Sequence, residues 1–176
     1  MSANGYDIAP AAPADVADVH ALIVGLAEYE RLTDLCVSTP ADIRVALFGS
    51  PAAAEALIVR DRGETRQALA FALFFHTFST FRGRRSLWLE DLFVRPEARG
   101  RGIGKALLLA LAAIAKARGC ARFEWSVLDW NRPAIGFYEK PGAQVLPDWR
   151  IARVTGPALD ALAAAGGPPP APTSTR

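Results

Sequence analysis

The chain has 176 residues, of which 51% are hydrophobic and 22% charged, so we expect one globular domain with a sizeable buried core. Its formal net charge is only +2, whereas a nucleic-acid-binding protein would carry a broader basic excess. The basic residues instead concentrate in one part of the chain, which suits a discrete anionic ligand. They include Arg82, Arg84, Arg85, Arg95, Arg99, Arg101 and Lys105.

The cysteines and the longest apolar stretch exclude further classes of protein. Cys36 and Cys120 have neither CxxC spacing nor the His/Cys spacing of a metal site, so we expect no metal. The apolar stretch 103–117 is amphipathic and is interrupted by Lys105 and Lys116, so we expect no membrane span. Because no secretory signal is recognisable, we expect a cytoplasmic protein with reduced thiols.

In the first half of the chain, the hydrophobic pattern predicts two helices and four strands. The first helix covers residues 15–30. The second runs from Pro40 to about Phe48, with Thr39 as its N-cap and Gly49 after its end. The predicted strands are residues 6–10, 54–60, 67–78 and 86–94, the middle two forming a hairpin around Gly63.

The second half alternates strands with helices. Apolar residues at helical spacing predict a helix from Ile103 to the stop at Gly119. Residues 122–128 follow as a strand, and Asn131 and Pro133 begin a helix that ends near Lys140. The last predicted strands are residues 143–145 and 149–154. This order predicts a mixed α/β sheet.

The end of the chain has a different composition. Residues 166–176 contain Gly, Pro, Ala, Ser and Thr with little to bury, so we expect disorder there. We therefore divide the chain into a domain at 1–156 and a C-terminal segment at 157–176 with a Pro/Ala-rich tail.

The most informative segment is a glycine-rich turn between a strand and a helix. The strand ends at Val94, Pro96 breaks it, and Gly100, Gly102 and Gly104 precede or open the helix. Glycine permits positive φ and lets an anion approach backbone amides without a Cβ in the way. The helix start adds unpaired N–H donors and the positive end of the dipole. The pattern predicts an anion site, with Arg99, Arg101 and Lys105 adding charge; the alternative is a turn that only connects strand to helix.

Two nucleotide motifs do not fit this turn. A Walker A loop requires glycine at the position of Arg99 and Ser or Thr at the position of Ala106. A dinucleotide fingerprint requires G-x-G-x-x-G near the first strand, whereas this chain has G-x-G-x-G in its middle.

The pattern Arg-x-x-Gly-x-Gly after a strand ending Val-x-Pro resembles the acetyl-CoA signature of the GNAT superfamily. Leu-Glu-Asp-Leu-Phe-Val at 89–94 and Trp-Asn-Arg-Pro-Ala-Ile-Gly-Phe-Tyr at 130–138 resemble the diamine (spermidine/spermine-type) acetyltransferases and their bacterial relatives. Residues 26–30 resemble the end of that family's first helix. The resemblance implies a GNAT fold, in which the mixed central sheet is splayed in the middle and helices cover both faces.

The resemblance also implies the reaction: transfer of acetyl from acetyl-CoA to a primary amine of a polyamine, diamine or amino-acid-like molecule, by direct attack in a ternary complex. It further implies a homodimer that pairs through the C-terminal strands. The alternatives are acetylation of a protein or an antibiotic, and a non-catalytic CoA-binding module.

By the same resemblance, the pantetheine arm of acetyl-CoA pairs with the backbone of Leu92, Phe93 and Val94. The pyrophosphate rests on the backbone amides of the turn and the first helical residues. The implied cofactor-binding residues are Leu92, Phe93, Val94, Arg99, Gly100, Arg101, Gly102, Ile103, Gly104, Lys105, Asn131, Arg132 and Pro133. Asn131 could equally serve only as a helix cap.

Tyr138 is the implied general acid for the departing thiolate, since a phenol has an ordinary pKa near 10 and is protonated at neutral pH; otherwise it only packs the helix. Glu90 lies where a strand would carry an apolar residue, so it is a candidate to accept the amine proton or bind the cationic substrate. Residues matching the family's other substrate contacts are Tyr29, Glu30, Glu124, Trp125 and Ser126. Glu30 and Glu124 could also be solvated surface charges.

One departure from the family pattern is Pro141, which stands where the family has an apolar residue after the Phe-Tyr pair. Proline is expected to end the helix early.

Overall fold

The computed structural model describes residues 5–167. The chain divides into two compact units, Met1–Ser126 and Val127–Arg176. The first contains β1 (Tyr6–Pro10), α1 (Val16–Glu30), α2 (Pro40–Phe48), β2 (Glu55–Asp61), β3 (Ala68–Ser79), β4 (Arg84–Val94), α3 (Ile103–Ala117) and β5 (Phe123–Trp125). The second contains α4 (Arg132–Glu139) and α5 (Pro157–Gly166).

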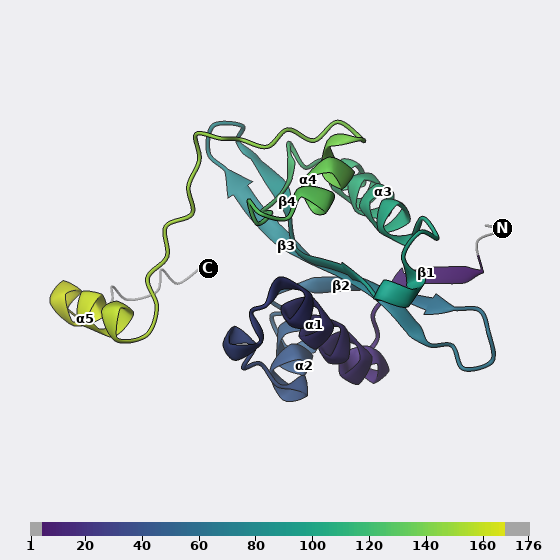
Figure 1. Ribbon diagram of the computed structural model, residues 1–176. Helices are drawn as coiled ribbons and strands as arrows, with labels where there is room; N and C mark the ends of the chain where they lie inside the picture. The colour runs from purple at the N-terminus through teal and green to yellow at the C-terminus, as the bar shows by residue number, and fades with distance from the viewer. Residues whose placement is uncertain (1–4, 168–176) are drawn as a thin grey trace. The chain divides into compact units, whose positions relative to one another are not determined.

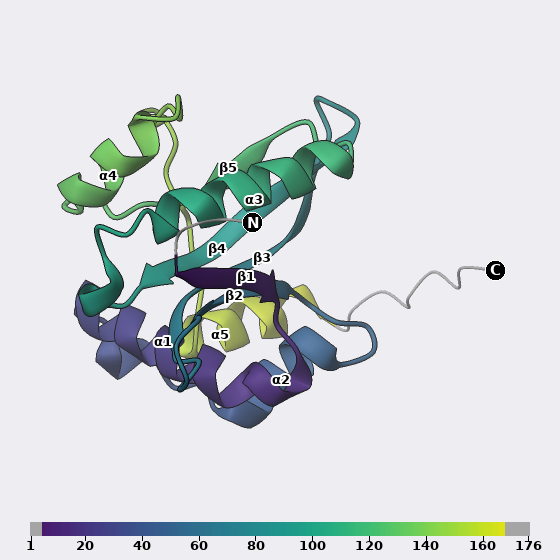
Figure 2. The same cartoon turned by 90° about the vertical axis from the view of Figure 1, so that its right-hand side faces the viewer.

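The first unit is built on one five-stranded sheet in the order β1-β2-β3-β4-β5. The first three pairings are antiparallel, whereas β4 and β5 pair in parallel. Helices α1 and α2 lie on one face of the sheet and α3 on the other (Figures 1 and 2). The predicted mixed α/β sheet with helices on both faces is therefore confirmed.

The core on the α1 side explains why these strands and helices pack together. Val19 and Leu22 of α1 are fully buried against Phe71 of β3 and Phe93 of β4. Gly25 allows α1 to approach the sheet closely, because a Cβ at this position would lie 3.0 Å from the Phe93 ring. On the opposite face, α3 buries its apolar stripe and contacts β3 and β4.

Strand β4 carries an irregularity that matters for the site. Leu73 of β3 pairs with Asp91, but the next residue, Phe74, pairs with Leu89. Glu90 is therefore the extra residue of a β-bulge. A bulge breaks the alternation of a strand; at this one, Glu90 is exposed and Asp91 beside it is partly buried.

The sheet also opens beside β4. Strand β5 pairs only with Leu87, Trp88 and Leu89. From Glu90 to Val94, no strand among the described residues borders that edge of β4. This is the splay that the family resemblance implied.

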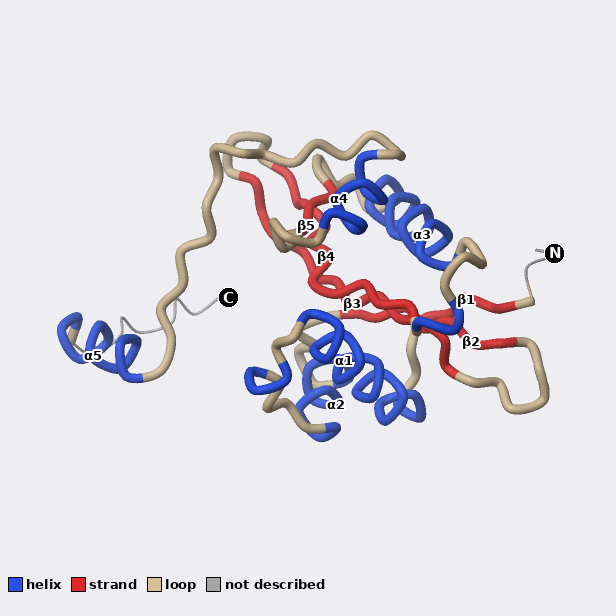
Figure 3. Tube along the Cα trace, in the orientation of Figure 1, coloured by secondary structure: helices blue, strands red, loops and turns tan. Residues whose placement is uncertain are grey.

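In the second unit, α4 begins as the sequence predicts, but the prediction of strands after it was wrong. Residues 143–145 and 149–154 form no strand, and Figure 3 draws the segment between α4 and α5 as loop. Residues 157–166, for which we predicted no element from the sequence, form the helix α5. Their alanine-rich sequence has high helix propensity. Residues 168–176, where we expect disorder, lie outside the described residues.

Candidate active site

The glycine turn between β4 and α3 exposes a row of backbone donors. Gly100 and Gly102 adopt φ values of 79° and 76°, and a Cβ on either would meet no atom within 4 Å. The first hydrogen bond of α3 joins the Ala106 amide to the Gly102 carbonyl at 3.0 Å. Within residues 5–167, no backbone carbonyl accepts a hydrogen bond from the amides of residues 100–105. Open amides at the positive end of a 15-residue helix form a site for an anion.

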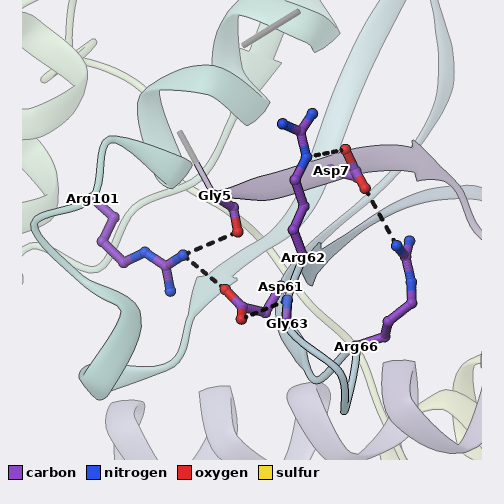
Figure 4. Close-up of polar contacts among 7 residues, drawn as sticks. All are labelled: Gly5, Asp7, Asp61, Arg62, Gly63, Arg66 and Arg101. Carbon is purple, nitrogen blue, oxygen red and sulfur yellow. Dashed lines mark hydrogen bonds and ion pairs between the residues drawn. The ribbon is translucent and has the colours of Figure 1, made fainter. Parts of the chain in front are cut away.

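The three cations of this turn have different environments. The Arg101 guanidinium points away from the turn, donating to Asp61 Oδ1 at 2.8 Å and to the Gly5 carbonyl at 3.4 Å (Figure 4). This hydrogen bond holds the pKa of Asp61 below its usual value. Lys105 is exposed, and no acidic group in the described part of the chain pairs with it. Of the side chains of Arg101 and Lys105, only that of Lys105 is without an acidic partner in the described part of the chain.

Arg99 connects the turn to α1. Its Nε donates to the Val94 carbonyl at 3.2 Å, and its guanidinium carbon lies 4.6 Å from the centre of the Tyr29 ring. It also lies 6.0 Å from the Phe93 ring centre. A guanidinium at this distance from an aromatic ring is attracted to it. Two residues predicted for different ligands, Arg99 and Tyr29, are therefore in direct contact.

Three carboxylates gather beside the open edge of β4. Glu90, at the bulge, accepts a hydrogen bond from Trp88 Nε1 at 2.8 Å. Burial, reinforced by the charges of Glu90 and Glu30, raises the pKa of Asp91 to about 7. Burial also raises the pKa of Glu30, the last residue of α1. A partly shielded negative cluster of this kind attracts a cationic amine.

Asp91 is the residue that sequence reasoning missed. In a regular strand, adjacent side chains point to opposite faces, so a regular β4 would not bring Glu90 and Asp91 to the same site. The bulge between Leu89 and Asp91 breaks this alternation. The signal was nevertheless present, because two adjacent acids interrupt a strand that is otherwise apolar from Leu87 to Val94.

The predicted substrate contacts of β5 have partners of their own. Glu124 pairs with Trp88 in the sheet register, and its Oε2 lies 3.2 Å from Arg122 Nε. The Trp125 ring packs against Phe123 with centroids 4.8 Å apart. Ser126 follows the strand and is exposed. The charge of Glu124 is thus partly balanced by a neighbour, unlike the charges of Glu30 and Glu90.

The remaining predicted residues belong to the second unit. Asn131 is buried, and its Oδ1 accepts a hydrogen bond from the Ala134 amide at 3.2 Å, so its predicted role as helix cap is confirmed. Arg132 and Pro133 form the exposed first turn of α4. The rings of Phe137 and Tyr138 lie 5.1 Å apart at 59°. The helix ends at Glu139, just before Pro141, as the proline predicts.

No group of three or more His, Cys, Asp or Glu side chains among the described residues could hold a metal ion. Across residues 5–167, no helix is both long and apolar enough to cross a membrane.

A mixed sheet that opens beside one strand, followed by an amide-lined turn at a helix start, defines the class that the motifs indicated, a GNAT-type acetyltransferase. Residues 27–143 match the acetyltransferase (GNAT) family. The chain belongs to this family and is an N-acetyltransferase. GNAT acetyltransferases use acetyl-CoA as the acetyl donor.

Curated relatives cover most of the chain. An L-ornithine N5-acetyltransferase of Arabidopsis thaliana is 34% identical, over 86% of this chain and 85% of the relative. A thialysine N-epsilon-acetyltransferase of Bos taurus is 34% identical, over 85% of this chain and 92% of the relative. Among solved structures, an integron cassette protein from V. cholerae has 25% identity and a TM-score of 0.75, covering 90% of this chain and 97% of that protein.

Proposed function

We propose that this enzyme transfers the acetyl group of acetyl-CoA to a primary amine of a small cationic molecule, such as a diamine, a polyamine or an amino acid with an amine side chain. The observation that carries the proposal is the cluster of Glu30, Glu90 and Asp91 beside the open edge of β4. The names of the relatives support it, because ornithine and thialysine are both amino acids with a side-chain amine.

The turn and β4 offer what acetyl-CoA requires. The amides of residues 100–105 bind the pyrophosphate, and Lys105 adds a positive charge. The unpaired edge of Leu92, Phe93 and Val94 provides backbone donors and acceptors for the pantetheine arm. An amide near Phe93 then stabilises the negative charge that develops on the thioester oxygen, an effect often worth about 3 kcal/mol.

The carboxylates bind and deprotonate the amine. Asp91 and Glu30 hold the cationic substrate, and Glu90 accepts the proton that the amine loses, through a water molecule. The neutral nitrogen attacks the thioester carbon directly, the carbon–sulfur bond breaks, and Tyr138 protonates the departing thiolate. The nitrogen then loses its second proton to the Tyr138 phenolate, which leaves the neutral amide and restores the phenol. Neither Cys36 nor Cys120 lies in the motifs at 89–105 and 130–138, so the proposal includes no covalent enzyme intermediate.

The test is a thiol-release assay with acetyl-CoA and a panel containing spermidine, ornithine, thialysine and a neutral amine. We expect turnover with the cationic amines and little with the neutral one. Tyr138→Phe should lower kcat by about 100-fold while calorimetry shows unchanged binding of acetyl-CoA. Binding of acetyl-CoA without turnover on any amine would favour a non-catalytic CoA-binding module, and unchanged turnover in the variant would eliminate Tyr138 as the acid.

We assign the acetyltransferase domain to residues 1–156. The family match at residues 27–143 crosses the boundary between the two compact units at Ser126 and Val127, which supports one functional domain. Purified 1–156 should retain the kcat of the full chain, whereas loss of turnover would extend the domain into α5.

The enzyme is further proposed to be a homodimer. Large apolar side chains of the segment between α4 and α5 are exposed, among them Trp149 at 75% and Ile151 at 68%, and such side chains are typical of a subunit interface. Light scattering after size-exclusion chromatography should give twice the monomer mass, and Trp149→Ser with Ile151→Ser should give the monomer. A monomeric wild-type protein would contradict this proposal.

A further inference from the structure

Strand β3 has an open edge far from the glycine turn. Its pairing with β2 ends where Phe74 meets Glu55, but β3 continues to Ser79. From Phe75 to Ser79 it pairs only with β4, and no strand in the described part of the chain lies on its other side. Backbone amides and carbonyls along such an edge can pair with another chain, and proteins usually protect them.

A hollow follows this edge. It has a volume of about 640 Å³, with residues 52–55 on one wall and residues 75–78 with Arg85 on the other. The backbone before β2 does not fill it, because the Ala53 and Ala54 amides both donate to the Ala46 carbonyl of α2. His76 Nε2 is buried here and has no hydrogen-bond partner within the described chain. The space that β2 would occupy if it were longer is therefore unfilled.

The surroundings of the hollow carry unbalanced positive charge. Arg82, Arg84 and Arg85 are exposed, and none of them pairs with an acidic residue in the described chain. The one carboxylate that lines the hollow, Glu55, is neutralised by Arg118, which donates to both of its oxygens. An approaching partner would therefore meet guanidinium groups and no free carboxylate.

The same hairpin presents two exposed phenylalanines. Phe78 is 65% exposed and Phe81, in the turn, is 99% exposed. The turn is held by Ser79, whose carbonyl and Oγ accept hydrogen bonds from the Arg82 amide at 3.2 and 3.3 Å. Large apolar side chains on an ordered, exposed turn indicate an interaction surface.

We propose that this edge binds an extended acidic segment of a partner protein, which adds to the sheet beside residues 75–79 of β3. A peptide backbone supplies donors and acceptors at the repeat of the open edge. Its carboxylates pair with Arg84 and Arg85, and its apolar side chains contact Phe78. Nucleic acid matches the charge but lacks a backbone that can continue a sheet, so we favour a peptide.

The test is fluorescence anisotropy with a labelled nine-residue peptide of alternating Glu and Val. We expect saturable binding that weakens at least tenfold in Arg84→Ala/Arg85→Ala and in Phe78→Ser. Arg44→Ala, which removes an exposed arginine on α2, is the matched control and should bind the peptide as the wild type does. Thermal unfolding and turnover should be unchanged in all variants, since these residues lie outside the proposed active site.

Two further peptides separate strand addition from simple charge attraction. An alternating Gln and Val peptide should bind at least tenfold more weakly, and so should a Glu and Val peptide with a fully N-methylated backbone. Equal binding of the N-methylated peptide would overturn the proposal, as would equal affinity of the Arg84→Ala/Arg85→Ala variant. Complete displacement of the peptide by an equimolar oligothymidylate would show that the surface binds nucleic acid instead.

Discussion

Replacing Asp91 by asparagine should stabilise the folded protein at alkaline pH while impairing the reaction. Burial and the neighbouring carboxylates raise the pKa of Asp91 from 3.8 to about 7, so the folded state holds a proton that the unfolded state releases at lower pH. A raised carboxyl pKa means that wild-type stability is lost as pH rises between these two values. One pKa unit corresponds to about 1.4 kcal/mol, so the loss reaches about 4 kcal/mol above pH 7.

Asparagine has the same shape and does not ionise, so Asp91→Asn avoids this loss. Urea unfolding of both proteins at half-unit steps from pH 4.5 to 8.5 measures the difference in stability between them. The variant's advantage in the free energy of unfolding should grow from about 1 kcal/mol at pH 4.5 to about 4 kcal/mol at pH 8. Above pH 7, where Asp91 of the wild type is ionised, the variant's KM for the amine should be at least tenfold higher, because the cation loses one of its carboxylate partners; at pH 5 the two KM values should converge.

Asp61→Asn is the matched control. Its carboxyl pKa is lowered by Arg101, so this variant should lose stability at neutral pH, and the loss should disappear as the pH falls. A stability difference between Asp91→Asn and wild type that does not change from pH 4.5 to 8.5 would refute the assignment of a raised pKa to Asp91.

Three further substitutions test the site. Gly102→Ala has space for its methyl group but an unfavourable φ; it should cost about 1 kcal/mol of stability and raise KM for acetyl-CoA, and an unchanged KM would argue against the turn as the pyrophosphate site. Gly25→Leu overpacks the Phe93 ring and should cost about 2 kcal/mol in urea unfolding, whereas no loss would mean that α1 moves freely. Asn131→Ala removes the cap of α4 and should cost about 1 kcal/mol; a loss of acetyl-CoA affinity as well would show that Asn131 also contacts the cofactor.

The first unit could be predicted closely because local signals agreed with each other. Thr39 and Asp42 form a reciprocal capping box at the start of α2, and the glycines at 100 and 102 adopt the conformation that their spacing predicts. The bulge at Glu90 could not be foreseen, because it depends on how β3 and β4 align rather than on either strand alone. For the same reason, the sequence indicated that Arg101 carries charge near the turn but not that it pairs with Asp61, 40 positions away.

The second unit was harder to predict because its segments have few neighbouring elements with which their backbones could pair. Trp149, Ile151 and Val154 have the composition of a strand, yet a strand requires an adjacent strand to pair with. Alanine-rich residues such as those of α5 can form a helix from backbone hydrogen bonds within the segment. Where the described residues offer no neighbouring strand, the intrinsic helix propensity of a segment therefore determines its secondary structure.

The contact of Arg101 with Asp61 and Gly5 has a consequence for affinity. It ties the loop before α3 to the residue preceding β1 and to the end of β2, so the loop has its shape before any ligand arrives. The conformational entropy of the loop is lost during folding, so ordering the loop does not weaken the binding of a ligand. Since the contact between Arg101 and Asp61 is an exposed ion pair, high ionic strength should weaken it. Part of any salt dependence of acetyl-CoA binding would then originate in Arg101, whose side chain does not contact the phosphates.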